Sequence, residues 1–204
     1  MLAQEYGCRV VGIDINPAMV AKSTERAHKM GLAEKTTFGE ASATALPFDV
    51  GQFDIVFSES VNSFIPGPVR ALEEYLRVLS LGGRVGINEC VWLTPPPEGL
   101  RRYMERVTGA NFLNGEDWEL LLRQAGFESG TASIHRTSTV RQWSSETEQL
   151  DVADVARAWL TLPWTVFTNA DSRRWVLSTL AMPPSIMRLF HYFGYGLFSA
   201  TKLR

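Results

Sequence analysis

The sequence has few cysteines, no concentration of positive charge and no long apolar run, and each absence excludes a class of protein. Cys8 and Cys90 have no metal-ligand spacing and suggest no disulfide framework, so we expect two core thiols in a reducing, cytoplasmic setting and no metal site. The formal net charge is -2 at pH 7 and no Lys/Arg cluster stands out, which gives no reason to expect a nucleic-acid partner. No apolar run is long enough to span a bilayer, and the first residues lack the basic and apolar regions of a signal peptide.

A glycine-rich turn is also missing ahead of the first expected strand. Residues 2–6 have the pattern of a helix end and residues 9–13 that of a buried strand, so the sequence opens in the middle of a motif. We therefore expect the N-terminal strand and Gly-rich loop of a nucleotide-binding fold to be absent. One flank of the strand at residues 9–13 would then be unpaired, and we expect self-association through that sheet edge.

A junction between a strand and a helix organises the first part of the chain. The β-branched run at residues 9–13 ends at Asp14, Asn16 is a good N-cap, Pro17 suits the first helical position and Gly31 ends the helix. Asp14 therefore sits at the carboxyl end of a strand, where open α/β sheets bind ligands. It either accepts hydrogen bonds from ribose hydroxyls or only caps the turn.

Strand and helix patterns then alternate along the chain, which predicts a Rossmann-like, doubly wound α/β fold with a mostly parallel sheet. Parallel strands at residues 53–57 and 84–89 would bring Ser58, Glu59 and Glu89 to the same edge as Asp14. Further strands are expected at residues 36–38 and 131–134, and helices at residues 100–107 and after Asn114.

The helix that begins at Pro68 has apolar residues at helical spacing, and its charged residues fall on other faces. We expect Val69, Leu72, Leu76 and Leu79 to form the buried stripe. We expect a solvated face formed by Arg70, Glu73, Glu74 and Arg77.

The C-terminal third breaks the alternation. We expect a core at residues 1–141, a helical cover at residues 142–193 and a closing strand at residues 194–204, pairing antiparallel at an edge of the sheet. Aromatic side chains in the cover either line an acceptor pocket or form the cover's own core; they are Trp159, Trp164, Phe167, Trp175, Phe190, Tyr192 and Phe193.

Several short motifs, in this order and spacing, resemble the class I S-adenosylmethionine-dependent methyltransferases, especially the small-molecule branch similar to the ubiquinone/menaquinone C-methyltransferases. They are Gly-Ile-Asp-Ile-Asn-Pro-Ala-Met at 12–19, Gly-Glu-Ala at 39–41, Leu-Pro-Phe at 46–48, Phe-Asp-Ile-Val-Phe-Ser at 53–58, Leu-Ser-Leu-Gly-Gly-Arg at 79–84 and Tyr-Gly-Leu-Phe-Ser-Ala-Thr-Lys at 195–202. A nicotinamide-dependent oxidoreductase would share the junction of strand, Asp and helix, but it has no reason to carry Ala-x-x-Leu-Pro-Phe before a Phe-Asp-Ile-Val-Phe strand.

The resemblance implies S-adenosyl-L-methionine as cofactor and a role for five residues. Asp14 would bind the ribose hydroxyls, Ile15 would form an apolar wall for the adenine, Glu40 and Ala41 would lie at the adenine edge, and Ser58 would lie beside the cofactor. The family usually has Asp where Glu40 stands and Pro where Leu81 stands.

The acceptor would be a small molecule, hydrophobic or aromatic if the cover forms a pocket. A general base is needed for a hydroxyl or activated carbon, and the candidates at strand ends are Glu59 and Glu89, with His135 third and Tyr103 and His191 behind it. The two glutamates also have a plain structural reading as solvated rim carboxylates, and His135 and His191 as structural histidines with satisfied hydrogen bonds. The competing functions are a non-catalytic binding module on a methyltransferase fold and a nicotinamide-dependent oxidoreductase.

Overall fold

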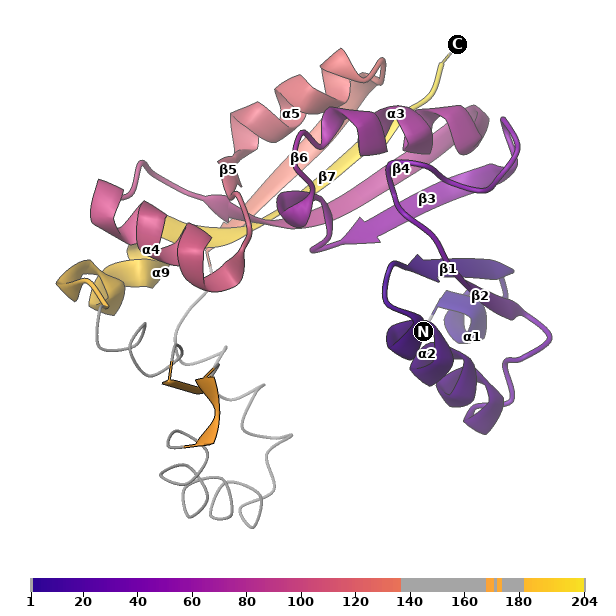
Figure 1. Ribbon diagram of the computed structural model, residues 1–204. Helices are drawn as coiled ribbons and strands as arrows, with labels where there is room; N and C mark the ends of the chain where they lie inside the picture. Colours follow the sequence, from indigo (N-terminus) through magenta and orange to yellow (C-terminus); the bar gives the residue numbers. More distant parts are fainter. Residues whose placement is uncertain (1, 137–167, 171, 174–181, 204) are drawn as a thin grey trace.

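The structure is a computed structural model that describes residues 2–136, 168–170, 172–173 and 182–203. The described strands form two separate sheets, one of two strands and one of five (Figure 1). The expected α/β architecture is confirmed. The two strands nearest the N-terminus do not pair with the rest, which differs from the single continuous sheet that the sequence led us to expect.

The small sheet is the predicted junction of strand and helix. Strand β1 (Val10–Asp14) pairs in parallel with β2 (Thr36–Glu40), with α1 (Leu2–Glu5) before them and α2 (Pro17–Lys29) between them. The Asn16 side chain accepts a hydrogen bond of 2.9 Å from the Ala18 amide, as an N-cap does, and Pro17 begins the helix. Local sequence signals therefore fix this part of the fold.

The larger sheet has strand order β3-β4-β7-β6, and the short β5 pairs with β4. Its members are β3 (Phe53–Glu59), β4 (Leu79–Trp92), β5 (Leu113–Asn114), β6 (Glu128–Arg136) and β7 (Phe193–Thr201). The closing strand is antiparallel as predicted, but it lies between β4 and β6 and not at an edge. Its inside position was not predictable because strand order depends on contacts far apart in the sequence.

Helices α3 (Val69–Val78) and α5 (Gly115–Gln124) cover one face of the larger sheet (Figure 1). The core beneath them is apolar, with Leu72, Leu79, Val85, Val91 and Trp118 at 0% exposure. A second apolar cluster lies near α4 (Glu98–Thr108), η2 (Pro184–Arg188) and α9 (Leu189–Tyr192) and contains Trp92, Leu100, Ala110 and Phe112. None of the helices in the described ranges is long and apolar enough to cross a membrane.

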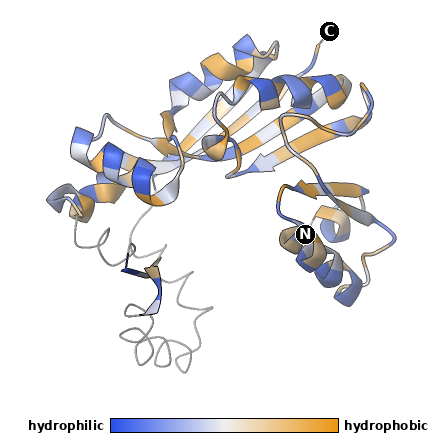
Figure 2. Cartoon of the chain, viewed as in Figure 1, coloured by the Kyte–Doolittle hydropathy of each residue, from blue (hydrophilic) through white to orange (hydrophobic). Residues whose placement is uncertain are grey.

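Large apolar side chains are exposed along two strands that each have one neighbour. Strand β3 is an edge of the larger sheet, with Ile55 70% and Phe57 56% exposed, and Figure 2 shows the strand as largely hydrophobic. Among the described strands, β1 pairs with β2 alone, and its Val11 is 42% exposed. Edges of this kind present unpaired backbone groups and can pair with another strand.

The two cysteines and the expected helical cover are the remaining features that the sequence analysis singled out. Cys8 is exposed and Cys90 is half-buried, so the expectation of two core thiols is wrong for Cys8, which lies between α1 and β1. Most of the expected cover at residues 142–193, including Trp159, Trp164 and Phe167, lies outside the described residues, so its role stays a prediction.

Candidate functional site

Two carboxylates come together where β1 and β2 end. In the parallel register Asp14 is the direct partner of Glu40, so both side chains leave the sheet at its carboxyl edge. The Ala41 amide donates a hydrogen bond of 3.1 Å to the Asp14 carbonyl and fixes the turn after β2. The structure therefore brings together three of the residues that the sequence singled out.

Asp14 caps the turn and keeps further acceptor capacity. Its Oδ1 accepts a hydrogen bond of 2.8 Å from the Asn16 amide, and among the described residues no donor reaches Oδ2 or the Glu40 carboxylate. Ile15 beside them is 73% exposed, which leaves an apolar side chain in solvent next to two acceptors. Capping and ligand binding are thus compatible at Asp14, because they use different oxygens.

A buried polar network occupies the end of β3. Ser58 is 6% exposed and its Oγ accepts a hydrogen bond of 2.9 Å from Asn62 Nδ2. Asn62 is fully buried, and its Oδ1 accepts a hydrogen bond of 3.0 Å from the Tyr75 hydroxyl. Burial raises the pKa of Tyr75, which keeps the hydroxyl protonated and able to donate.

Glu89 lies at the centre of this region and is 1% exposed. Its Oε1 accepts hydrogen bonds from the Val61 amide (3.0 Å), the Asn62 amide (2.7 Å) and Asn62 Nδ2 (3.1 Å). Its Oε2 accepts from the Ser63 amide (3.3 Å) and hydroxyl (2.7 Å). A carboxylate enclosed in this way has little room for an acceptor molecule, so these contacts favour a role in holding the chain over the predicted role of general base.

Two of the other candidate bases, Glu59 and His135, are not brought to Glu89. Glu59 is exposed at the end of β3, and its register partner is Asn88. His135 pairs with Tyr195, which pairs in turn with Cys90, so alternation along β4 puts the histidine on the face opposite to Glu89. His135 stacks on the Tyr195 ring with centroids 5.0 Å apart, and its Nε2 lies 2.8 Å from Ser133 Oγ. Both stay predictions as bases.

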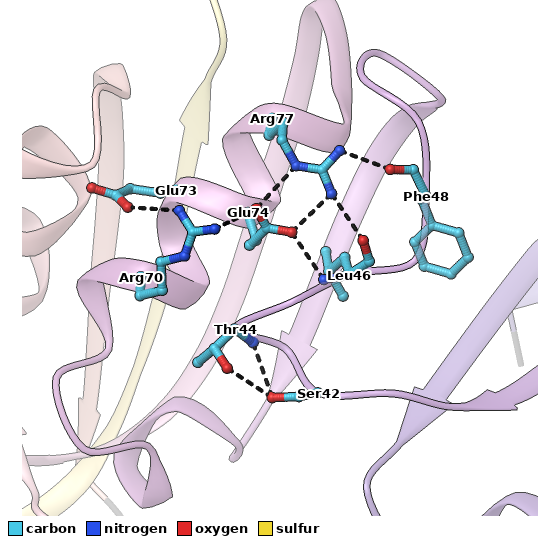
Figure 3. A network of polar contacts seen from close by, with 8 residues as sticks. All are labelled: Ser42, Thr44, Leu46, Phe48, Arg70, Glu73, Glu74 and Arg77. Carbon is cyan, nitrogen blue, oxygen red and sulfur yellow. Dashed lines mark hydrogen bonds and ion pairs between the residues drawn. The ribbon is translucent and has the colours of Figure 1, made fainter.

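A second network fixes the segment that leads from the small sheet into β3 (Figure 3). Glu74 Oε2 accepts a hydrogen bond of 2.9 Å from the Leu46 amide, and Arg77 donates to the carbonyls of Leu46 (2.9 Å) and Phe48 (2.7 Å). Arg77 and Glu74 also form an ion pair at 2.8 Å. The Leu-Pro-Phe segment is therefore held by charged side chains of α3.

This arrangement corrects the expected solvated face of α3. Glu74 is 4% exposed, and the buried stripe contains Ala71, Glu74, Tyr75 and Val78, which are spaced i, i+3, i+4, i+7. The helix ends at Val78, and Leu79 belongs to β4. In the sequence, Ala71 and Tyr75 at this helical spacing were the signal that could have predicted the burial of Glu74.

The pH dependence of this network gives a first prediction. Hydrogen bonding to Arg77 lowers the pKa of Glu74 from its usual value of 4.5, so the folded state favours the ionised form and gains stability above that pH. The gain is lost as pH falls through the lowered pKa. We expect Glu74→Gln to lower the free energy of unfolding by about 1–3 kcal/mol at pH 7, and by progressively less below about pH 4.

Urea unfolding of both proteins from pH 7 to pH 3 measures this difference. Glu73→Gln is the matched control, because Glu73 is an exposed neighbour and should cost less than about 0.5 kcal/mol. If Glu74→Gln lowers the free energy of unfolding by the same amount at every pH, the charge of the carboxylate is not the cause of the lost stability.

The chain is similar in sequence to known methyltransferases. A family model described as "Methyltransferase domain" matches residues 1–87. The ubiquinone/menaquinone biosynthesis C-methyltransferase UbiE of Allorhizobium ampelinum is 30% identical over 153 residues, covering 60% of this chain and 59% of that protein. The chain spans about half the length of the first curated relatives that it matches, 53% and 54%.

Solved structures with this fold include enzymes of two kinds. The crystal structure of the cyclase SpnF superposes with a TM-score of 0.74 at 22% identity, over 98% of this chain and 68% of that one. A geranyl diphosphate methyltransferase in complex with S-adenosylmethionine gives a TM-score of 0.70 at 14% identity, over 98% of this chain and 71% of that one.

The parallel strands that end in carboxylates and the antiparallel strand β7 define a Rossmann-like α/β fold. The matches in sequence show that the chain is similar to S-adenosylmethionine-dependent methyltransferases of small molecules, and the solved structures share its fold.

Proposed function

We propose that the protein binds S-adenosylmethionine and transfers its methyl group to a small acceptor. The observation that carries this proposal is the Asp14–Glu40 pair at the carboxyl ends of β1 and β2. Two carboxylates with free oxygens can accept the hydrogen bonds of vicinal hydroxyls, and a ribose supplies two such donors. When bound, the cofactor supplies an electrophilic methyl group.

The residues around the pair fit the remaining parts of a nucleoside. The exposed Ile15 side chain offers an apolar surface for a base, and Ala41, held by its amide to Asp14, is small enough to let a ring approach. Ser58 would lie at the second sheet, where its hydroxyl is held by Asn62. Few chemical groups are needed for methyl transfer, because alignment of the two reactants and exclusion of water provide most of the rate.

We further propose a hydrophobic or aromatic acceptor, with Glu59 or His135 as the base if one is required. Two exposed apolar side chains follow β3, Val61 at 43% and Phe64 at 55%, and Tyr195 stacks with His135. Such surfaces suit an apolar ligand better than a sugar or a nucleic acid. The cover expected at residues 142–193 would add to this environment.

Cofactor binding gives the second prediction. Asp14→Ala should weaken binding of S-adenosylmethionine or S-adenosylhomocysteine by about 1–3 kcal/mol, because it removes a charged acceptor from the ribose hydroxyls. Isothermal titration calorimetry measures the affinity, and Asp49→Ala, in an exposed turn, is the control. Equal affinity of wild type and Asp14→Ala would remove Asp14 from the site. A protein that binds but transfers no methyl group would support the binding-module alternative.

The exposed edges give the third prediction, which is self-association through β1 or β3. Light scattering should show dimers or larger species at high micromolar concentration, and Ile55→Lys should reduce them because a charge on an edge strand opposes pairing. Leu120→Lys replaces an equally apolar exposed residue on α5 and should leave association unchanged. A monomeric wild type would contradict the proposal.

A further inference from the structure

Glu89 of β4 holds the segment that follows β3 in the larger sheet. Three consecutive amides, those of Val61, Asn62 and Ser63, point at one carboxylate, and two side chains add further donors. Three of the participating residues are buried to 95% or more, so each group would lose its hydrogen bonds without gaining water if the carboxylate were removed. Among the described residues, no other side chain accepts as many buried hydrogen bonds as Glu89.

The segment held by Glu89 begins in a strained conformation. Ser60 has φ of 52°, and it is the only described residue other than glycine with positive φ. Its amide donates a hydrogen bond of 2.7 Å to the Asn88 carbonyl, directly before Glu89 in β4. Serine rarely adopts a positive φ unless surrounding contacts hold it there. Residues in such conformations concentrate at functional sites.

The same carboxylate is linked to Ser58 through one intermediate. Asn62 Nδ2 donates to both Glu89 Oε1 and Ser58 Oγ, and the Tyr75 hydroxyl holds the amide oxygen. The orientation of the Asn62 amide is thus set by three partners. A change at Glu89 would release Asn62 and, through it, the hydroxyl of Ser58.

We propose that Glu89 is a positioning residue that holds residues 60–64, the clamped loop, and Ser58 in the geometry that binds the cofactor. This role rests on the proposed function and replaces proton transfer by Glu89. The Glu89 side chain is suited to it because its two oxygens accept five hydrogen bonds. Two side chains of the clamped loop, Val61 and Phe64, are exposed to solvent where β3 of the larger sheet ends.

Glu89→Gln tests the proposal with little change of shape. The amide oxygen can keep the three bonds of Oε1, but its NH₂ group faces the Ser63 amide, so at least one backbone hydrogen bond is lost. We expect faster hydrogen exchange at the amides of residues 61–63 and an affinity for S-adenosylhomocysteine reduced about tenfold. Ser63→Ala, which removes only the hydroxyl bond, should produce smaller changes of both kinds.

Two controls separate positioning from general destabilisation. Glu119→Gln changes an exposed glutamate of α5 and should alter neither measurement. Val78→Ala lowers stability from a buried position on α3 and should leave affinity unchanged while the protein is folded. Thermal unfolding of each variant confirms that the titrations are performed on folded protein.

The outcomes distinguish this proposal from the proposed function. Faster exchange together with weaker binding supports it, and faster exchange with unchanged binding overturns it by leaving only a structural role. Unchanged exchange in Glu89→Gln also overturns it. A wild-type protein that does not bind S-adenosylhomocysteine contradicts the proposed function and the positioning role together, whereas a failure confined to Glu89→Gln contradicts the positioning role alone.

Discussion

Replacing Gly194 by alanine is expected to destabilise the protein by about 3 kcal/mol or more, and so to lower the midpoint of thermal unfolding by about 6–12 °C. A Cβ at this position would press on the carbonyl oxygen of His135, well inside contact distance, and would lie 2.9 Å from Leu93 Cδ2. The obstructing oxygen belongs to the backbone of β6, which pairs with β7 here and cannot move alone. Differential scanning calorimetry provides the midpoint and the enthalpy.

Gly99→Ala is the matched control for this substitution. Gly99 lies in α4, and a Cβ there would meet nothing within 4 Å. Alanine should be neutral or stabilising by up to about 1 kcal/mol, because it restricts the unfolded chain. A Gly194→Ala protein as stable as Gly99→Ala would show that β7 is not packed against β6 and Leu93 as described.

Trp118→Ala is expected to cost about 3–5 kcal/mol, because it removes the largest side chain that is fully buried among the described residues. Trp118 lies on α5 with no exposed surface and packs against Phe198 of β7, with ring centroids 6.3 Å apart. The loss would leave a cavity between the helix and the closing strand. Denaturant unfolding followed by circular dichroism measures it without relying on tryptophan fluorescence.

Trp118→Phe separates packing from hydrogen bonding at the same position. The indole Nε1 is buried and has no acceptor among the described residues, so phenylalanine removes an unsatisfied donor along with some volume. We expect it to cost less than half as much as alanine. Equal losses for the two variants would indicate that the indole N–H does have a partner.

The β1–α2 junction was predictable because its signals are local. The helix begins at Pro17 after an Asn16 cap, and Asp14 meets Glu40 because parallel strands of matching length end together. Each of these outcomes depends on residues close in sequence or on one strand pairing. The family resemblance added the cofactor roles, which remain proposals for the individual residues.

The buried glutamates and the strand order were not predictable in the same way. Glu89 accepts hydrogen bonds from residues 26–28 positions away, and Glu74 from the amide of Leu46, 28 positions away, so neither partner set is visible in a short window. An acidic residue in a helical or strand pattern is normally exposed. The separation of β1 and β2 from the larger sheet is likewise a matter of pairing between distant segments.

The inside position of β7 has a consequence for the order of assembly. During synthesis β4 and β6 emerge before β7, yet in the described sheet they are joined through β7, and Lys202 Nζ donates a hydrogen bond to the Leu79 carbonyl across 123 residues of sequence. Until β7 arrives, β4 and β6 each have an open side, and closing so long a loop is entropically slow. The nascent chain therefore carries unpaired strands until the segment that contains β7 has left the ribosome, which makes translation speed and chaperone capture relevant to its yield.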